Sequence, residues 1–271
     1  MRNFNNKNNK IALITTVGNI SLYKRTVSFF PENIKLFAID GTDGLFGLNS
    51  IKFMFKKLKN HKIKWLILAD EDVIFINSSI VFDIISNLEE EKIDVCGIRD
   101  GGMLSWRDKN PYLPNPFFCI INLENIFPIY SEIEFINNQY ILTDEFNDDL
   151  SDLIYPYNKD SLFEGYYCFF LWLRRKKMRF KFLKAKAAGF ENDYATTEVY
   201  GFKNEVFLYH TWYARTYGKN EYHTKRIEKV IDKGFELKGI EKRNIVWLKN
   251  YSFSFEKKLR KLKNKIFNLF K

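Results

Sequence analysis

Two aspartates near the middle of the segment 64–77 have the residue type and spacing to hold a metal ion. In KWLILADEDVIFIN, an apolar run leads into Asp70, Glu71 and Asp72 and then continues beyond them. An isolated buried carboxylate is very costly, so these side chains must be paired, neutralised or bound to a cation. Mg²⁺ and Mn²⁺ take such oxygen ligands, often together with phosphate oxygens. The spacing predicts a metal and diphosphate site; the alternative is a solvated turn, and no role is assigned to Glu71.

The elements that must position these carboxylates alternate between strands and helices. Short apolar runs predict buried strands at 11–18, 34–41 and 64–70, and helical spacing predicts helices at 21–30 and 48–62. This alternation predicts an α/β domain with a mainly parallel sheet flanked by helices. Ligands of such sheets bind beyond the carboxyl ends of the strands, where Asp40 and the carboxylates at 70–72 are expected.

The same pattern continues to about residue 220. We expect a helix at 78–91, strands at 92–98 and 116–123, loops at 99–115 and 131–160, a helix from 164 that leads to a strand near 183, and a last strand within 204–218. Beyond it Lys and Arg become dense. The predicted organisation is a polar leader (1–10), a catalytic domain (11–220) and a basic helical C-terminal extension (221–271).

Composition restricts the class of protein. The 271 residues are 46% hydrophobic, enough for a substantial core, and the net charge of +10 favours an anionic partner. The excess of Phe, Ile, Asn and Lys is what AT-rich coding supplies and indicates a bacterial source. Three dispersed cysteines form no metal-type pair and favour a reducing compartment. The sequence has no apolar run near the roughly 20 residues of a membrane span, and 1–10 lacks the apolar part of a secretory signal.

Two other enzyme classes use related residues and fit less well. Phosphatases of the haloacid dehalogenase type place a DxD motif on the first strand with Thr or Val two residues after the second Asp, whereas here the motif follows the third strand and Ile74 stands there. A nucleotidyltransferase needs a Gly-rich basic loop after the first strand, where this chain has TTVGNISLYKR.

The ordered pieces resemble the GT-A glycosyltransferases, which use a nucleotide-diphosphate sugar and a divalent metal in a Rossmann-like fold. LILADED is similar to the run that ends in their DxD motif, and the resemblance covers roughly residues 11–218. It implies that Asp70 and Asp72 bind Mn²⁺ or Mg²⁺ on the diphosphate, and that a late histidine, His210 in LYHTWYARTYG, completes the metal site. It also implies that Thr15, Thr16 and Asp40 surround the nucleobase.

Further pieces of the resemblance concern the sugar and the acceptor. Asn115 begins NPFFCIINL, which is similar to a donor-binding segment of the galactosyltransferase branch. Glu164 matches the first member of a Glu-Asp pair in inverting enzymes, but Gly165 replaces the Asp that serves as general base. We therefore expect Glu164 to be the catalytic carboxylate, with the identity of the base left open.

Three other residues are candidates on chemical grounds. Asp100 precedes two glycines and is expected to hydrogen-bond the donor sugar. Arg215 and Lys219 follow His210 closely and are expected to hold the diphosphate, since a guanidinium makes bidentate contacts with phosphate oxygens.

The C-terminal segment 255–271, FEKKLRKLKNKIFNLFK, predicts a basic amphipathic helix. Its apolar stripe suits an anionic membrane interface better than a nucleic acid, so no nucleic-acid partner is expected. Together with the basic C-terminal segment, the resemblance implies a metal-dependent glycosyltransferase on the cytoplasmic face of a bacterial membrane. It would transfer a sugar, with a UDP-sugar as the first choice of donor, to a glycan or lipid-linked acceptor in surface polysaccharide or lipooligosaccharide synthesis. The alternative is a non-catalytic, membrane-associated protein that binds nucleotides or carbohydrates on a relic of this fold.

Overall fold

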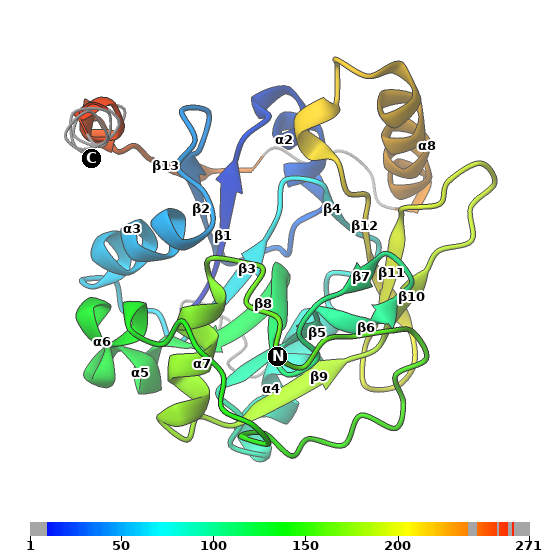
Figure 1. Cartoon of the computed structure of the whole chain (residues 1–271). Helices are drawn as coiled ribbons and strands as arrows, with labels where there is room; N and C mark the ends of the chain where they lie inside the picture. The colour runs from blue at the N-terminus through cyan, green and yellow to red at the C-terminus, as the bar shows by residue number, and fades with distance from the viewer. Residues whose placement is uncertain (1–9, 238–242, 254, 260–261, 263–271) are drawn as a thin grey trace, which may run out of the picture.

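A seven-stranded mixed sheet forms the centre of the chain, with strand order β13-β2-β1-β3-β8-β5-β9 (Figure 1). The computed structural model describes residues 10–237, 243–253, 255–259 and 262. In this order the strands are β13 (Ile245–Leu248), β2 (Lys35–Asp40), β1 (Ile11–Val17), β3 (Trp65–Ala69), β8 (Pro114–Asn122), β5 (Val95–Arg99) and β9 (Phe180–Leu183). Only β8 runs antiparallel to its neighbours in this sheet. The expected α/β domain with a mainly parallel sheet is confirmed, and it is compatible with a Rossmann-like fold.

Helices cover both faces of this sheet because its central strands are apolar on both sides. In β1 the side chains alternate, so that Leu13 packs into one core and Ile14 into the other. The first core includes α2 (Ile20–Thr26), α4 (Ile80–Glu90) and α8 (Glu221–Leu237). The second includes α3 (Leu48–Leu58), α5 (Leu123–Ile126), α6 (Glu132–Ile136) and α7 (Tyr167–Arg175).

A second sheet has the strand order β10-β11-β12-β4 and packs beside the first. Its strands are β10 (Ala185–Ala187), β11 (Thr197–Tyr200), β12 (Val206–His210) and β4 (Val73–Phe75). β4 begins directly after the carboxylate turn at 70–72, and its antiparallel partner β12 pairs His210 with Val73. This pairing brings the end of β12 to the carboxylate turn, although the two segments are far apart in sequence.

The structure differs from the sequence-based expectation in the following segments. The segment 131–160, predicted as loops, contains the short helix α6. The segment 99–115, predicted as a loop, contains a hairpin of β6 (Gly101–Leu104) and β7 (Arg107–Asp108). The segment 221–271, predicted to be helical, contains β13, which pairs in parallel with β2, so that β12 is not the last strand. These three strands are short. β6 and β7 pair with each other across residues 105–106, whereas β13 pairs with β2, which is far away in the sequence.

The amphipathic helix predicted at 255–271 lies mostly outside the described residues. Within it, 255–259 and 262 have helical backbone, and Phe255, Leu259 and Leu262 are exposed. Among the residues that the structure describes, no helix is both long and apolar enough to cross a membrane.

Candidate metal centre

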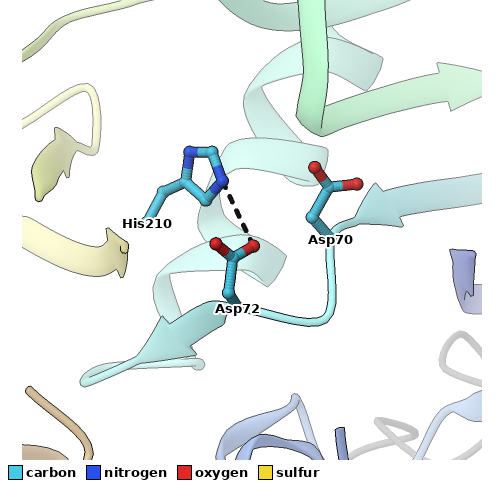
Figure 2. Close-up of side chains that lie close together, drawn as sticks. All are labelled: Asp70, Asp72 and His210. Carbon is cyan, nitrogen blue, oxygen red and sulfur yellow. Dashed lines mark ion pairs between the residues drawn. The ribbon is translucent and has the colours of Figure 1, made fainter. Parts of the chain in front are cut away.

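Asp70, Asp72 and His210 converge at the carboxyl end of β3 (Figure 2). One ligand atom from each residue lies within 4.8 Å of the others, and His210 Nε2 is 3.2 Å from Asp72 Oδ1. The strand pairing of β4 with β12 fixes this arrangement, and the amide of Thr211 donates to the carbonyl of Asp72 at 3.1 Å. The predicted metal ligands are therefore brought together.

Burial of the carboxylates makes binding of a cation at this turn electrostatically favourable. Asp72 and His210 are each 2% exposed. Burial and the neighbouring Asp72 raise the pKa of Asp70 to about 6, against the opposing effects of His210 and Arg215. A divalent ion removes such repulsion between buried carboxylates.

The donor set also fits the ion in chemistry and spacing. Two carboxylates and an imidazole suit Mn²⁺, and carboxylates suit Mg²⁺. Neighbouring ligands of an ion with bonds of about 2.1 Å are about 3 Å apart, close to the 3.2 Å between His210 and Asp72. The imidazole is held by stacking on Phe117, at 4.1 Å between ring centroids, and by contact with Trp212 at 4.3 Å. Its Nδ1 atom is buried and has no hydrogen-bond partner among the described residues, so its orientation comes from packing.

Glu71 points away from the candidate ligands and fastens their turn to the first strand. Its Oε1 accepts hydrogen bonds from the amides of Gly18, at 3.0 Å, and Asn19, at 3.1 Å. Burial, followed by the charges of Asp70 and Asp72, raises its pKa to about 8. The sequence assigned no role to Glu71; the structure makes it a positioning residue for the turn.

The loop after β12 is also held against the segment that follows β1. The side-chain amide of Asn19 donates to the carbonyls of Ala214, at 3.0 Å, and Tyr217, at 2.9 Å. Trp212 and Tyr213 have φ angles of 58° and 63°, a left-handed conformation that is unusual for bulky residues and occurs often at functional sites. Buried Arg226 stabilises it by donating to the carbonyl of Trp212 at 3.1 Å.

The candidate metal ligands line a cavity of about 670 Å³. One part of its wall is apolar and comes from β1, β2, β3 and α3, with Ile14, Ile39, Leu68, Ile51 and Met54. Most of the polar groups come from the carboxylate turn, β7, the residues before α7 and the loop after β12. A concave site with an apolar wall and a few convergent polar groups is typical of a small-molecule site.

The cavity separates the residues predicted from sequence into two groups. Those that line it are Thr16, Asp70, Asp72, Asn115, Glu164, His210 and Arg215. Those that do not are Thr15, Asp40, Asp100 and Lys219. Strand alternation turns Thr15 to the opposite face of β1 from Thr16. Asp40 accepts hydrogen bonds from Thr42 within its own turn and lies 3.7 Å from Lys249. Lys219 is exposed beyond the turn that carries Arg215.

Asp100 has a different role from the one expected. Its side chain has no exposed surface, so it is out of reach of a sugar in the cavity. Its two carboxylate oxygens accept hydrogen bonds from five donors, which come from Arg107, Asn115, Tyr166 and Tyr167. Asp100 is therefore a buried anchor for residues that reach the cavity.

Arg107 is a charged cavity residue that the sequence did not indicate. Its Nε and Nη2 atoms donate to Asp100 at 2.8 and 2.7 Å, and Nη2 also donates to Glu164 Oε1 at 3.1 Å. Burial alone would lower the pKa of Arg107, but the charge of Asp100 raises it above its usual range. It lies in a Gly-rich segment that was predicted as a loop, and only the hairpin aims it at Glu164.

Arg215 also lines the cavity, in the loop after β12. It is exposed, and its guanidinium lies over the ring of Phe46 at 3.9 Å from the centroid. Both residues line the cavity, so this contact joins the loop after β2 to the loop after β12.

Comparison of the sequence with models of protein families gives no match, and comparison with curated proteins gives no similar sequence. The geometry of the site and the order of the motifs are therefore the basis for assigning an activity.

Proposed function

We propose that this protein is a metal-dependent glycosyltransferase of the GT-A type. It transfers a sugar from a nucleotide-diphosphate sugar, with a UDP-sugar as the first choice of donor. The acceptor is a glycan or a lipid-linked molecule in bacterial surface polysaccharide or lipooligosaccharide synthesis. One observation carries most of the proposal: Asp70, Asp72 and His210 meet at the carboxyl end of a parallel strand, inside a cavity of about 670 Å³. Ligands of open α/β sheets bind at this edge.

On the donor side, Asp70, Asp72 and His210 hold Mn²⁺ or Mg²⁺. The bound ion supplies charge neutralisation for the departing diphosphate. The guanidinium of Arg215 also binds the diphosphate, through two parallel N–H donors to its oxygens. The apolar wall formed by β1, β2 and α3 receives the nucleobase, and the hydroxyl of Thr16, which donates to Ser50 Oγ at 3.0 Å, borders it.

On the acceptor side, Glu164 is the one predicted catalytic residue that reaches the cavity. Its carboxylate accepts the proton of the attacking hydroxyl. Arg107 orients that carboxylate through the 3.1 Å contact with Oε1, and buried Asp100 orients Arg107 in turn. A group that must be aligned with an attacking oxygen gains from such fixed support.

The test of the metal site uses titration calorimetry and Mn²⁺ electron paramagnetic resonance on Asp72→Asn and His210→Ala. We expect each to weaken Mn²⁺ binding at least about tenfold, because one ligand is removed from a set of three. Asp83→Asn and His61→Ala change the same residue types at exposed positions and serve as controls. Unchanged Mn²⁺ binding in both ligand variants, with both folded by circular dichroism, would refute the metal assignment.

A second experiment separates the enzyme from a non-catalytic binding protein. UDP- and GDP-sugars are titrated with and without Mn²⁺, and then incubated with acceptor glycans and with water alone. The proposal requires metal-dependent binding together with sugar transfer or slow donor hydrolysis that Glu164→Gln reduces. Tight binding without turnover would favour the non-catalytic alternative, to which Gly165 at the expected position of a catalytic Asp gives support.

We further propose a peripheral location at the cytoplasmic face of the membrane through the basic C-terminal segment. The exposed apolar side chains of Phe255, Leu259 and Leu262 support this, since each is at least 40% exposed next to a Lys- and Arg-rich sequence.

A further inference from the structure

Four aromatic rings lie in mutual contact at the rim of the cavity, and the side chains of the two outer members, Tyr213 and Tyr194, also approach each other. Tyr213, which lines the cavity, stacks on His223 with ring centroids 4.1 Å apart. His223 contacts Tyr222 at 5.1 Å, and Tyr222 stacks on Tyr194 at 5.9 Å with an angle of 9° between the rings. We call these four residues the aromatic row.

Three separate segments contribute to the aromatic row. Tyr194 lies in the connection between β10 and β11, Tyr213 in the loop after β12, and Tyr222 with His223 in the first turn of α8 (Figure 1). Other contacts fix the row in place. The hydroxyl of Tyr222 donates to the carbonyl of Asn192 at 2.9 Å. Tyr213 has a left-handed backbone and directly follows Trp212, whose carbonyl accepts a hydrogen bond from Arg226.

The tyrosines of the row remain open to solvent. Tyr194 is 59% exposed, Tyr213 47% and Tyr222 41%, and none of them belongs to either hydrophobic core. Rings that served only to pack the fold would be buried. A preformed set of exposed aromatic side chains beside a cavity is typical of a recognition surface.

The charges around the row favour an uncharged ligand. Arg226 is paired with Asp193 at 3.2 Å, and Lys225 with Glu221 at 2.6 Å. Burial and then Arg226 lower the pKa of His223, which keeps its ring neutral at physiological pH. The row therefore presents the outer ring faces, ring edges and tyrosine hydroxyls, with little net charge, and these match the C–H faces and hydroxyl groups of sugars.

We propose that the aromatic row is a binding track for a neutral oligosaccharide, the acceptor chain, whose growing end reaches the cavity beside Tyr213. The inference rests on the proposed glycosyltransferase function and extends it from the site of transfer to the class of acceptor. The four rings together form a surface broader than one sugar, so the track binds a chain of several sugars more tightly than a single sugar.

The test uses saturation-transfer-difference NMR with chitotriose, maltotriose and mannotriose as neutral probes, and N-acetylglucosamine as a single-sugar probe. At least one trisaccharide should bind, and more tightly than the single sugar. Tyr194→Ala and Tyr222→Ala should each weaken that binding about tenfold, since an aromatic contact is lost. Tyr194→Phe and Tyr222→Phe should retain most of it. Tyr251→Ala, at a residue 88% exposed and outside the row, is the matched control.

UDP and Mn²⁺ are titrated into the same preparations, so that failure of the track and failure of the proposed function can be told apart. The track requires the two Ala variants to bind UDP and Mn²⁺ as the wild-type protein does. Weakened UDP binding with unchanged trisaccharide binding would overturn the inference, because the rings would then serve the nucleotide. Absence of trisaccharide binding in a wild-type protein that binds UDP would also overturn it and would leave the donor site intact.

Discussion

Replacement of Asp100 by Asn tests whether this buried carboxylate supports the polar side of the cavity. Oδ1 accepts from Arg107 Nε and Asn115 Nδ2, while Oδ2 accepts from Arg107 Nη2 and two tyrosine hydroxyls. An amide offers one acceptor oxygen and one donor NH₂ group. Whichever way it is turned, its NH₂ faces at least one N–H group that cannot accept a hydrogen bond. The tyrosine hydroxyls can rotate, but the guanidinium cannot.

The expected cost follows from the burial of Arg107. Its side chain is 15% exposed, and without Asp100 its remaining counter-ion is Glu164, whose side chain is 28% exposed. Removal of one partner of a buried ion pair typically costs about 3–5 kcal/mol. For a chain of this length that lowers the melting temperature by about 10 °C.

The assay is urea unfolding followed by circular dichroism, with thermal unfolding as a second readout. Asp108→Asn is the matched control: it lies next to Arg107, its side chain is 64% exposed, and its contact is with Lys109, so no measurable shift is expected. The double variant Asp100→Asn/Arg107→Met should lose less than the sum of the single changes, since the unpaired charge is removed with its partner. A loss below about 1 kcal/mol in Asp100→Asn would refute the anchoring role.

Three further predictions follow from other parts of the molecule. Gly101→Ala should prevent the β6–β7 hairpin from forming, because a Cβ atom would lie 1.9 Å from the backbone oxygen of Lys109. Gly165→Ala should be tolerated, because no atom lies within 4 Å of the added Cβ. Thermal unfolding of both variants checks this contrast. With metal removed by EDTA, the stabilisation from protonated Glu71 is complete below pH 4.5 and is lost as the pH rises through about 8. The free energy of unfolding of the wild-type protein should therefore fall over this pH window more steeply than that of Glu71→Gln. Equal slopes of the two proteins in urea unfolding at several pH values would contradict the raised pKa. Leu259→Ser/Leu262→Ser should reduce sedimentation with vesicles containing anionic lipid, relative to Ile133→Ser at another exposed apolar position; equal binding of the three proteins would refute the membrane proposal.

Local patterns in the sequence were sufficient for the α/β class and for locating the candidate metal ligands Asp70 and Asp72. Apolar runs of strand length and amphipathic helices carry their own periodicity, and two charges at the end of a buried strand are visible without a partner. His210 followed from the resemblance of ordered motifs. A lone histidine carries no such local signal, and the pairing of β12 with β4 brings it to Asp72.

Tertiary contacts decided what each remaining polar residue does. Asp100 and Glu71 are carboxylates near strand ends like Asp70, yet one is buried behind Arg107 and the other accepts from the amides of Gly18 and Asn19. A sequence shows where a charge occurs along the chain, but the direction of a side chain depends on segments that fold against it from a distance. For the same reason β13 became visible only when it paired with β2 at the edge of the sheet. The sequence by itself determined the class of fold and the location of the turn that carries the candidate metal ligands, while the tertiary structure alone decided which charges face the cavity and which hold it in shape.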